Sequence, residues 1–194
     1  MKKEPKNDLR YIKTEKLIQK TFRDMILEMD YTQITIRELT ERAKINRKTF
    51  YLHYTSLDSL LAVCQTKLYD EFLQSISDIH LPTDLEKLIR HIFTLWNIPD
   101  EANRKILYSR GNFPIGKSPG DYARKAIFRL GCSDGYLSKY TTKQIELIDA
   151  YLNGIFTFIH YQWETNNREM SFEDVVSLTT QLISHGFLSL DLQV

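Results

Sequence analysis

The sequence predicts an all-α protein, and two observations support this. Apolar side chains recur at steps of three and four residues along most of the 194 residues, which is the period of an amphipathic helix. No segment shows a convincing alternation of apolar and polar residues, the pattern of a half-buried strand. We therefore expect a protein built from helices, with ample length for a buried core.

The first sixty residues predict three helices and the start of a fourth. Apolar residues repeat at helical steps over residues 17–29 and indicate the first helix. Thr35 followed by Glu38 has the pattern of a capping box, which starts a second helix. Asn46 is a favourable N-cap for a third helix, and Ser56 can cap the fourth.

The rest of the chain predicts further helices, separated by prolines and by one loop. The long fourth helix is expected to end before Pro82, and the next, over residues 85–96, ends before Pro99. Residues 109–121 hold three of the seven glycines and two of the five prolines, which is typical of a loop. The other expected helices lie around residues 106–107, 122–130, 148–163 and 171–190.

Charge is distributed unevenly, although the net charge is only +1. Residues 1–60 carry 13 Lys and Arg against 9 Asp and Glu, whereas the remainder carries 13 against 16. A basic front on an acidic body suits a nucleic-acid reader joined to another domain, and an ordinary solvated surface is the alternative. No signal peptide, no apolar run near the ~20 residues of a membrane span and no cysteine pairing motif are evident, so we expect a cytoplasmic protein.

Residues 35–54, TIRELTERAKINRKTFYLHY, have the layout of a helix-turn-helix. Residues 35–43 form the expected supporting helix, residues 47–52 form the expected recognition helix, and Phe50 is expected to pack inward. The residues expected to reach DNA bases or phosphates are Thr35, Arg37, Asn46, Arg47, Lys48, Thr49, Tyr51, His53 and Tyr54. A plain helical hairpin with solvated charges is the alternative.

These residues resemble the N-terminal domain of the tetracycline-repressor (TetR) family. The T-x-x-E-L-x-E-x-A run, the R-x-T-F-Y-x-H-Y run and the distance between them carry the resemblance. Two positions depart from it: Lys44 stands where the family usually has Gly, and Leu57 where it often has a phosphate-binding Lys. In the penultimate helix, GIFTFIHYQWE is weakly similar to the branch that includes dihydroxyacetone-kinase operon regulators.

The resemblance implies a DNA-binding domain over residues 1–56 and a helical ligand-binding and dimerisation domain over residues 57–194. It also implies a homodimer that reads a pseudo-palindromic operator and releases it when a small molecule shifts the fourth helix. We expect repression rather than activation, because a dimer covering an operator blocks polymerase without further contacts. A protein of the same fold without an effector, in an architectural or cell-cycle role, is the alternative.

Two further sets of residues follow from the C-terminal helices. The aromatic-rich helices predict an effector pocket lined by Leu68, Phe72, Phe93, Trp96, Tyr151, Phe156 and His160, unless these side chains simply fill the core. The two long, capped last helices predict a dimer interface made by Ile148, Ile155, Ile159, Leu182, Phe187 and Leu190.

An enzymatic reading finds little support in the sequence. Residues 116–120 match the G-x-S-x-G elbow of serine hydrolases, but no strand precedes them and Pro119 has no N–H to serve an oxyanion. The first 110 residues contain no glycine, which excludes a phosphate-binding loop there, and the five histidines lack metal-ligand spacing. We therefore expect no catalytic site, cofactor or metal.

Overall fold

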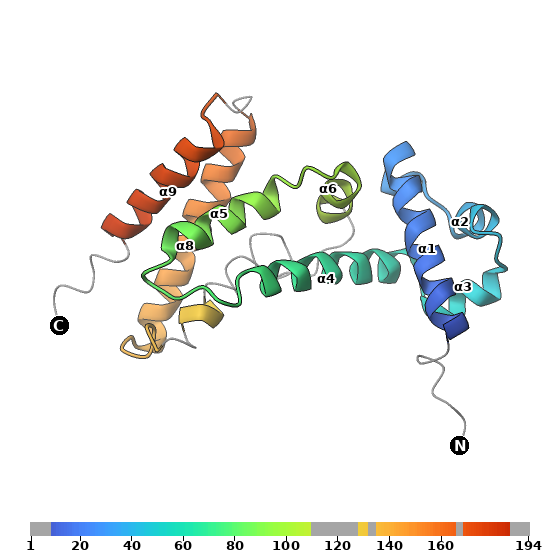
Figure 1. Ribbon diagram of the computed structural model, residues 1–194, viewed down its shortest axis with the longest axis horizontal. Coiled ribbons are helices and arrows are strands. Elements are labelled where there is room, and N and C mark those ends of the chain that lie inside the picture. The colour runs from blue at the N-terminus through green and yellow to red at the C-terminus, as the bar shows by residue number, and fades with distance from the viewer. Residues whose placement is uncertain (1–8, 110–127, 132–134, 166–168, 187–194) are drawn as a thin grey trace, which may run out of the picture. The chain divides into compact units, whose positions relative to one another are not determined.

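The computed structural model describes residues 9–109, 128–131, 135–165 and 169–186. These residues form helices joined by turns and loops, with no strand among them, so the all-α prediction is confirmed (Figure 1). The chain divides into two compact units. We call Met1–Asp70 with Ile98–Asn112 the head, and Glu71–Asn97 with Phe113–Val194 the body. A domain boundary at residue 56 stays a prediction.

The head combines two long helices with short helices whose starts are fixed by side-chain caps. Its elements are α1 (Leu9–Glu28), the 3-10 turn η2 (Tyr31–Gln33), α2 (Ile36–Arg42), α3 (Arg47–His53), most of α4 (Leu57–Ser75) and α6 (Glu101–Tyr108). The Thr35 hydroxyl accepts the Glu38 amide at 3.2 Å, and Asn46 Oδ1 accepts the Thr49 amide at 2.8 Å. The Ser56 hydroxyl accepts the Ser59 amide at 3.1 Å. All three predicted caps are therefore confirmed.

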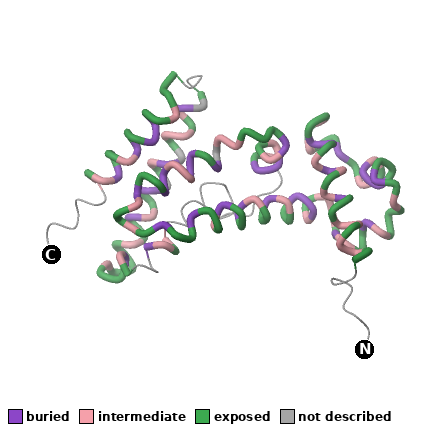
Figure 2. Tube along the Cα trace, in the orientation of Figure 1, coloured by how far each residue is buried: buried purple, intermediate pink, exposed green. Residues whose placement is uncertain are grey.

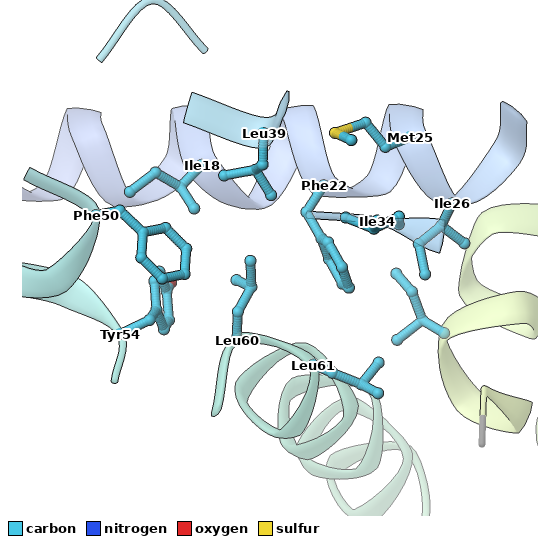
Figure 3. Close-up of a cluster of buried hydrophobic side chains, with 11 residues drawn as sticks. Ile18, Phe22, Met25, Ile26, Ile34, Leu39, Phe50, Tyr54, Leu60 and Leu61 are labelled. Atoms are coloured by element: carbon cyan, nitrogen blue, oxygen red, sulfur yellow. The ribbon is translucent and has the colours of Figure 1, made fainter. Parts of the chain in front are cut away.

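One apolar cluster holds the head together. Side chains from α1, α2, α3 and α4 point toward one another in it (Figure 3). Its buried members are Ile18, Phe22, Met25, Ile26, Ile34, Leu39, Phe50, Tyr54, Leu60, Leu61 and Ile106. In Figure 2, buried segments in purple alternate with pink and green segments along the helices. Leu57 packs partly buried against this cluster, so the residue in place of a family lysine serves the core.

Helix α6 belongs to the head although it lies more than forty residues after α3 in the sequence. The Arg23 guanidinium of α1 donates to Asp100 and Asn103 at the start of α6. From α4, the buried Gln65 amide donates to the carbonyl of Ile106 at 3.0 Å. Polar contacts therefore fasten α6 to α1 and α4, and the apolar cluster includes Ile106.

In the body, α5 (Leu85–Trp96), α8 (Thr142–Thr165) and α9 (Phe172–Gly186) pack together. Arg90 of α5 forms a two-pronged ion pair with Glu173 of α9, at 2.5 and 2.7 Å. The rings of Phe93 and Trp163 meet edge to face with centroids 5.9 Å apart. The predicted cap of the last helix is confirmed, because the Ser171 hydroxyl accepts the Asp174 amide at 3.1 Å.

The structure adds detail to the expected helices. The fourth helix ends at Ser75, well before Pro82, because residues 76–78 turn. A close helix approach explains Gly186, where a Cβ would lie 2.2 Å from the Tyr151 hydroxyl of α8, but not Gly154, which has open space around it. Most of the 109–121 loop, including the G-x-S-x-G match, and most of the 122–130 helix lie outside the described residues.

Candidate nucleic-acid interface

Helix α3 presents one face to the core and one to solvent. Phe50 is fully buried and anchors the helix in the head cluster. Arg47 and Lys48 are exposed, and Tyr51 is 55% exposed. The predicted division into an inward Phe50 and outward polar residues therefore matches the geometry of the helix. Two cations and a phenol point away from the core on a short, rigidly anchored helix.

Leu52, also on α3, is 74% exposed, and sequence reasoning did not select it. Because its side chain is so exposed, Leu52 contributes little to the apolar core of the head. An apolar side chain on a groove-facing helix can contact the methyl group of thymine. The signal in the sequence was the pair Tyr51–Leu52 after the inward Phe50, which helical geometry turns away from the core.

Thr49 and Asn46 are tied to each other at the start of α3. Asn46 is exposed, while Thr49 is half-buried, and the Thr49 hydroxyl donates to Asn46 Oδ1 at 3.1 Å. The same Asn46 oxygen accepts the Thr49 amide. Both side chains thus hold the N-terminus of α3, and a contact with DNA from either one has to compete with this cap.

The turn between α2 and α3 has the left-handed geometry that the family usually builds with glycine. Lys44 has a φ of +52°, and its amide donates to the carbonyl of Glu41 at 3.2 Å. The next amide, of Ile45, donates to the carbonyl of Thr40 at 3.0 Å, and Ile45 packs on the head cluster. The turn therefore accepts the strain of a non-glycine residue, about 1 kcal/mol or more, and leaves the Lys44 side chain exposed.

Helix α2 offers Thr35 and Arg37, both exposed. The Thr35 hydroxyl caps α2, as described above. Arg37 donates from Nε to Glu41 at 2.9 Å, and this ion pair raises the pKa of the guanidinium. Exposed pairs of this kind contribute little to stability. Arg37 can therefore exchange the Glu41 carboxylate for a phosphate at small cost.

His53 and Tyr54 at the end of α3 differ from the expectation. The His53 ring lies on the Tyr11 ring of α1, with centroids 3.9 Å apart, and the buried His53 Nδ1 has no hydrogen-bond partner among the described residues. Burial lowers the pKa of this imidazole, against a smaller opposing effect of Glu15. His53 is consequently a neutral donor or acceptor near neutral pH rather than a cation for phosphate.

Tyr54 is a correction to the predicted contacts. It is only 4% exposed, belongs to the head cluster, and its hydroxyl accepts the Gln19 amide at 3.0 Å. The sequence predicted that Tyr54, after the expected recognition helix, contacts a phosphate where the chain leaves the groove. Its extended backbone instead turns the ring under Phe50, where the two centroids lie 5.8 Å apart. We therefore leave Tyr54 out of the proposed DNA surface.

The residues predicted to line an effector pocket do not come together in one unit. Leu68 lies in the head and packs against its apolar cluster, whereas Phe72, Phe93, Tyr151, Phe156 and His160 lie in the body. In the body, Phe93 and Phe156 are buried while Tyr151 is 41% exposed. The side chain of Trp96 lies outside what the structure describes. Two cavities formed by described residues lie elsewhere, one in the head and a very small one beside Leu137.

On α8, each predicted dimer residue lies next in sequence to an exposed residue. Ile148 is 6% exposed and contacts its own unit, and Ile155 and Ile159 are half-buried. Leu182 of α9 is exposed, and Phe187 and Leu190 lie outside the described residues. The large apolar side chains that α8 and α9 leave exposed are Leu147, Tyr151, Phe158, Tyr161, Leu178 and Leu182.

Two distant relatives are transcriptional regulators. Over 83 residues, 42% of this chain, the sequence is 32% identical to the uncharacterized HTH-type transcriptional regulator YxbF of Bacillus subtilis strain 168. Over 80 residues, 41% of this chain, it is 30% identical to DhaS of Lactococcus lactis strain IL1403, the HTH-type transcriptional activator of the dhaKLM operon. The matched segments span 22% and 43% of the length of these two proteins. This similarity supports a DNA-binding regulator.

No family model and no solved structure matches the chain. Among the described residues, no group of three or more His, Cys, Asp or Glu is placed to hold a metal ion. No helix in the described ranges has both the length and the apolar character needed to cross a membrane.

Proposed function

We propose that this protein is a TetR-type transcriptional regulator that inserts α3 into the major groove of an operator. The observation that carries the proposal is the exposed face of α3, with Arg47, Lys48 and Tyr51 outward and Phe50 locked in the core. Because the backbone of α3 is already fixed in this way, only its exposed side chains have to be ordered when it enters the groove, where its cations contact bases and phosphates.

The contacts divide by chemistry. Lys44 and Lys48 are exposed cations without an ion pair among the described residues, and they suit phosphate. Arg47 and Tyr51 suit base edges, and Leu52 suits a thymine methyl group. Asn46 and Thr49 orient the start of α3 through the cap.

We further propose that the protein acts as a homodimer in the bacterial cytoplasm. Leu147, Tyr151 and Phe158 follow at helical spacing on α8, and Leu178 and Leu182 do so on α9. Exposed stripes of this size mark a contact surface, and a second copy of the chain is the partner that the family resemblance implies. Two heads then read the two halves of a pseudo-palindromic operator.

Repression is the proposed outcome, because a bound dimer blocks polymerase by occupying the operator. Activation is the second candidate, since the lactococcal relative bears the name of an activator. We retain the proposal that a small molecule bound in the body releases the operator by tilting α4, a helix whose residues belong to both units. A metabolite that stabilises the protein against heat would support this proposal over the effector-free alternative.

Selection of binding sites from a random DNA pool tests the central proposal. A palindromic consensus is the expected result, and a pool without enrichment would contradict it. On the selected operator, Tyr51→Ala is expected to weaken binding by roughly 1–3 kcal/mol while helix content stays unchanged. Lys48→Ala is expected to reduce the slope of log K against log salt by about one. Lys143→Ala, which removes an exposed lysine of the body, is the matched control and should leave the slope unchanged.

A further inference from the structure

A partly open cavity of about 390 Å³ lies within the head, away from the outward face of α3. Its walls come from the last turn of α1, from η2 and from α6. All of these elements belong to the same compact unit. The volume is in the range of small-molecule sites in proteins, so its lining decides what it would bind.

Aliphatic and aromatic side chains line much of the cavity. Ile26 and Met29 of the α1 end contribute aliphatic and thioether surface, and Tyr31 and Tyr108 contribute rings. The Tyr31 ring is held in place, because its edge meets the Phe22 ring and its hydroxyl donates to Asp58. A compact apolar or aromatic group fits against such a surface.

Opposite charges line the same cavity without pairing with each other. Lys105 reaches it from α6, where its ammonium donates to the carbonyl of Leu27 at 3.1 Å and lies 3.4 Å from Glu101. Asp30, the N-cap of η2, also lines the cavity, and its carboxylate forms no ion pair among the described residues. An ammonium has three donors, so Lys105 keeps one for a further acceptor.

We propose that this cavity is a binding site for an amphipathic zwitterion, of the class of apolar amino acids. The ligand ammonium pairs with Asp30, its carboxylate pairs with Lys105, and its apolar side chain lies against Met29 and the two tyrosine rings. The site is separate from the effector pocket proposed in the body. A ligand in this cavity would join α6 to η2, which continues through Ile34 to Thr35, the N-cap of α2. It would therefore influence how the helices of the head are arranged.

The methionines provide a direct way to locate binding on the full-length protein. Met29 lines the cavity, while Met170 lies in the body. With ¹³C-methyl-labelled methionine, L-phenylalanine is expected to shift the Met29 signal and leave Met170 unmoved. The assignment would be overturned if the Met170 methyl signal shifted while that of Met29 did not, or if the Met29 signal did not shift at millimolar ligand. No DNA is present, so the result is independent of the proposed operator binding.

Two analogues and two variants test the charge pairing. Phenylethylamine lacks the carboxylate and 3-phenylpropanoate lacks the ammonium, and each is expected to bind about tenfold or more weakly than L-phenylalanine. Lys105→Met should weaken L-phenylalanine to the same extent and leave phenylethylamine unchanged, which also shows that the variant is folded. Asp30→Asn should weaken the binding of L-phenylalanine and leave the binding of 3-phenylpropanoate unchanged. Equal affinities for all three ligands in the native protein would refute the zwitterion site.

Discussion

Lys44 shows how much one residue of the turn contributes. Its left-handed backbone lets the Lys44 and Ile45 amides reach carbonyls at the end of α2, and so sets the path from α2 to α3. A residue with a Cβ adopts this conformation at a cost of about 1–2 kcal/mol, whereas glycine adopts it freely. In the proposed DNA interface, this exposed cation beside α3 would offset that cost in function rather than in stability.

Lys44→Gly is therefore expected to stabilise the protein by about 0.5–1 kcal/mol, the relief of strain less the added freedom of the unfolded chain. Urea denaturation measures the difference. Lys44→Ala removes the charge but keeps the Cβ, so it should show no gain in stability. An equal gain in unfolding free energy in both variants would show that the lost charge, and not the relief of backbone strain, causes the effect.

His53 makes the stability of the protein depend on pH. Burial against Tyr11 lowers the pKa of the imidazole from 6.5, so the folded state binds this proton less readily than the unfolded state does. The stability that neutral His53 provides is thus present above about pH 6.5 and is lost as the pH falls through the lower folded pKa.

His53→Gln should consequently lose less stability than the native protein between about pH 7.5 and about pH 5.5. Urea midpoints at the two pH values measure this difference. His185→Gln, at an exposed histidine of α9, serves as the control and should follow the native protein. If all three proteins lost the same stability between the two pH values, His53 would not be the source of the pH dependence.

At the scale of elements, the caps decide where the short helices start. Helices α2 and α3 have seven residues each, too few to be stable alone in water. Their stability comes from Leu39 and Phe50 in the cluster and from one side-chain cap at each start. The orientation of the exposed face of α3 therefore depends on Asn46 as well as on Phe50.

Asn46→Ala is expected to cost about 1 kcal/mol of unfolding free energy, because the Thr49 amide loses its acceptor. Asn46→Asp keeps a cap oxygen and should stay within a few tenths of a kcal/mol of the native protein. Thermal and urea unfolding of both variants provide the measurement. An alanine variant as stable as the native protein would show that packing alone holds the start of α3.

At the scale of the whole molecule, the exposed apolar side chains of α8 and α9 form the surface of the proposed dimer interface. Leu147 and Phe158 are 72% and 63% exposed, well above the level of a side chain that its own unit covers. The proposed homodimer would bury them and place two heads on one operator.

Light scattering at micromolar concentration should then give the mass of a dimer. Phe158→Glu and Leu182→Glu should each yield monomers and abolish operator binding, because a buried unpaired carboxylate is costly in the interface. Leu9→Glu changes an equally exposed leucine of the head and should leave the dimer intact. A monomeric native protein would contradict the proposed assembly.

The sequence by itself determined the local features of this protein. Capping residues at positions 35, 46, 56 and 171 and the helical spacing of apolar residues act over a few residues, so they identify the helix starts and the inward Phe50 without knowledge of the fold. The helix-turn-helix is a local motif of this kind, which is why most of its exposed residues were predicted from the sequence.

Only the tertiary structure decided the features that join distant residues. The stacking of Tyr11 on His53, the hydrogen bond from Gln19 to Tyr54 and the docking of α6 on α1 depend on contacts between segments separated by 35 residues or more. In α8, Ile148 and Leu147 are both apolar neighbours, and packing against the rest of the body determines which one is covered. The cavity of the head arises in the same way, because its walls meet only when α6 returns to the end of α1.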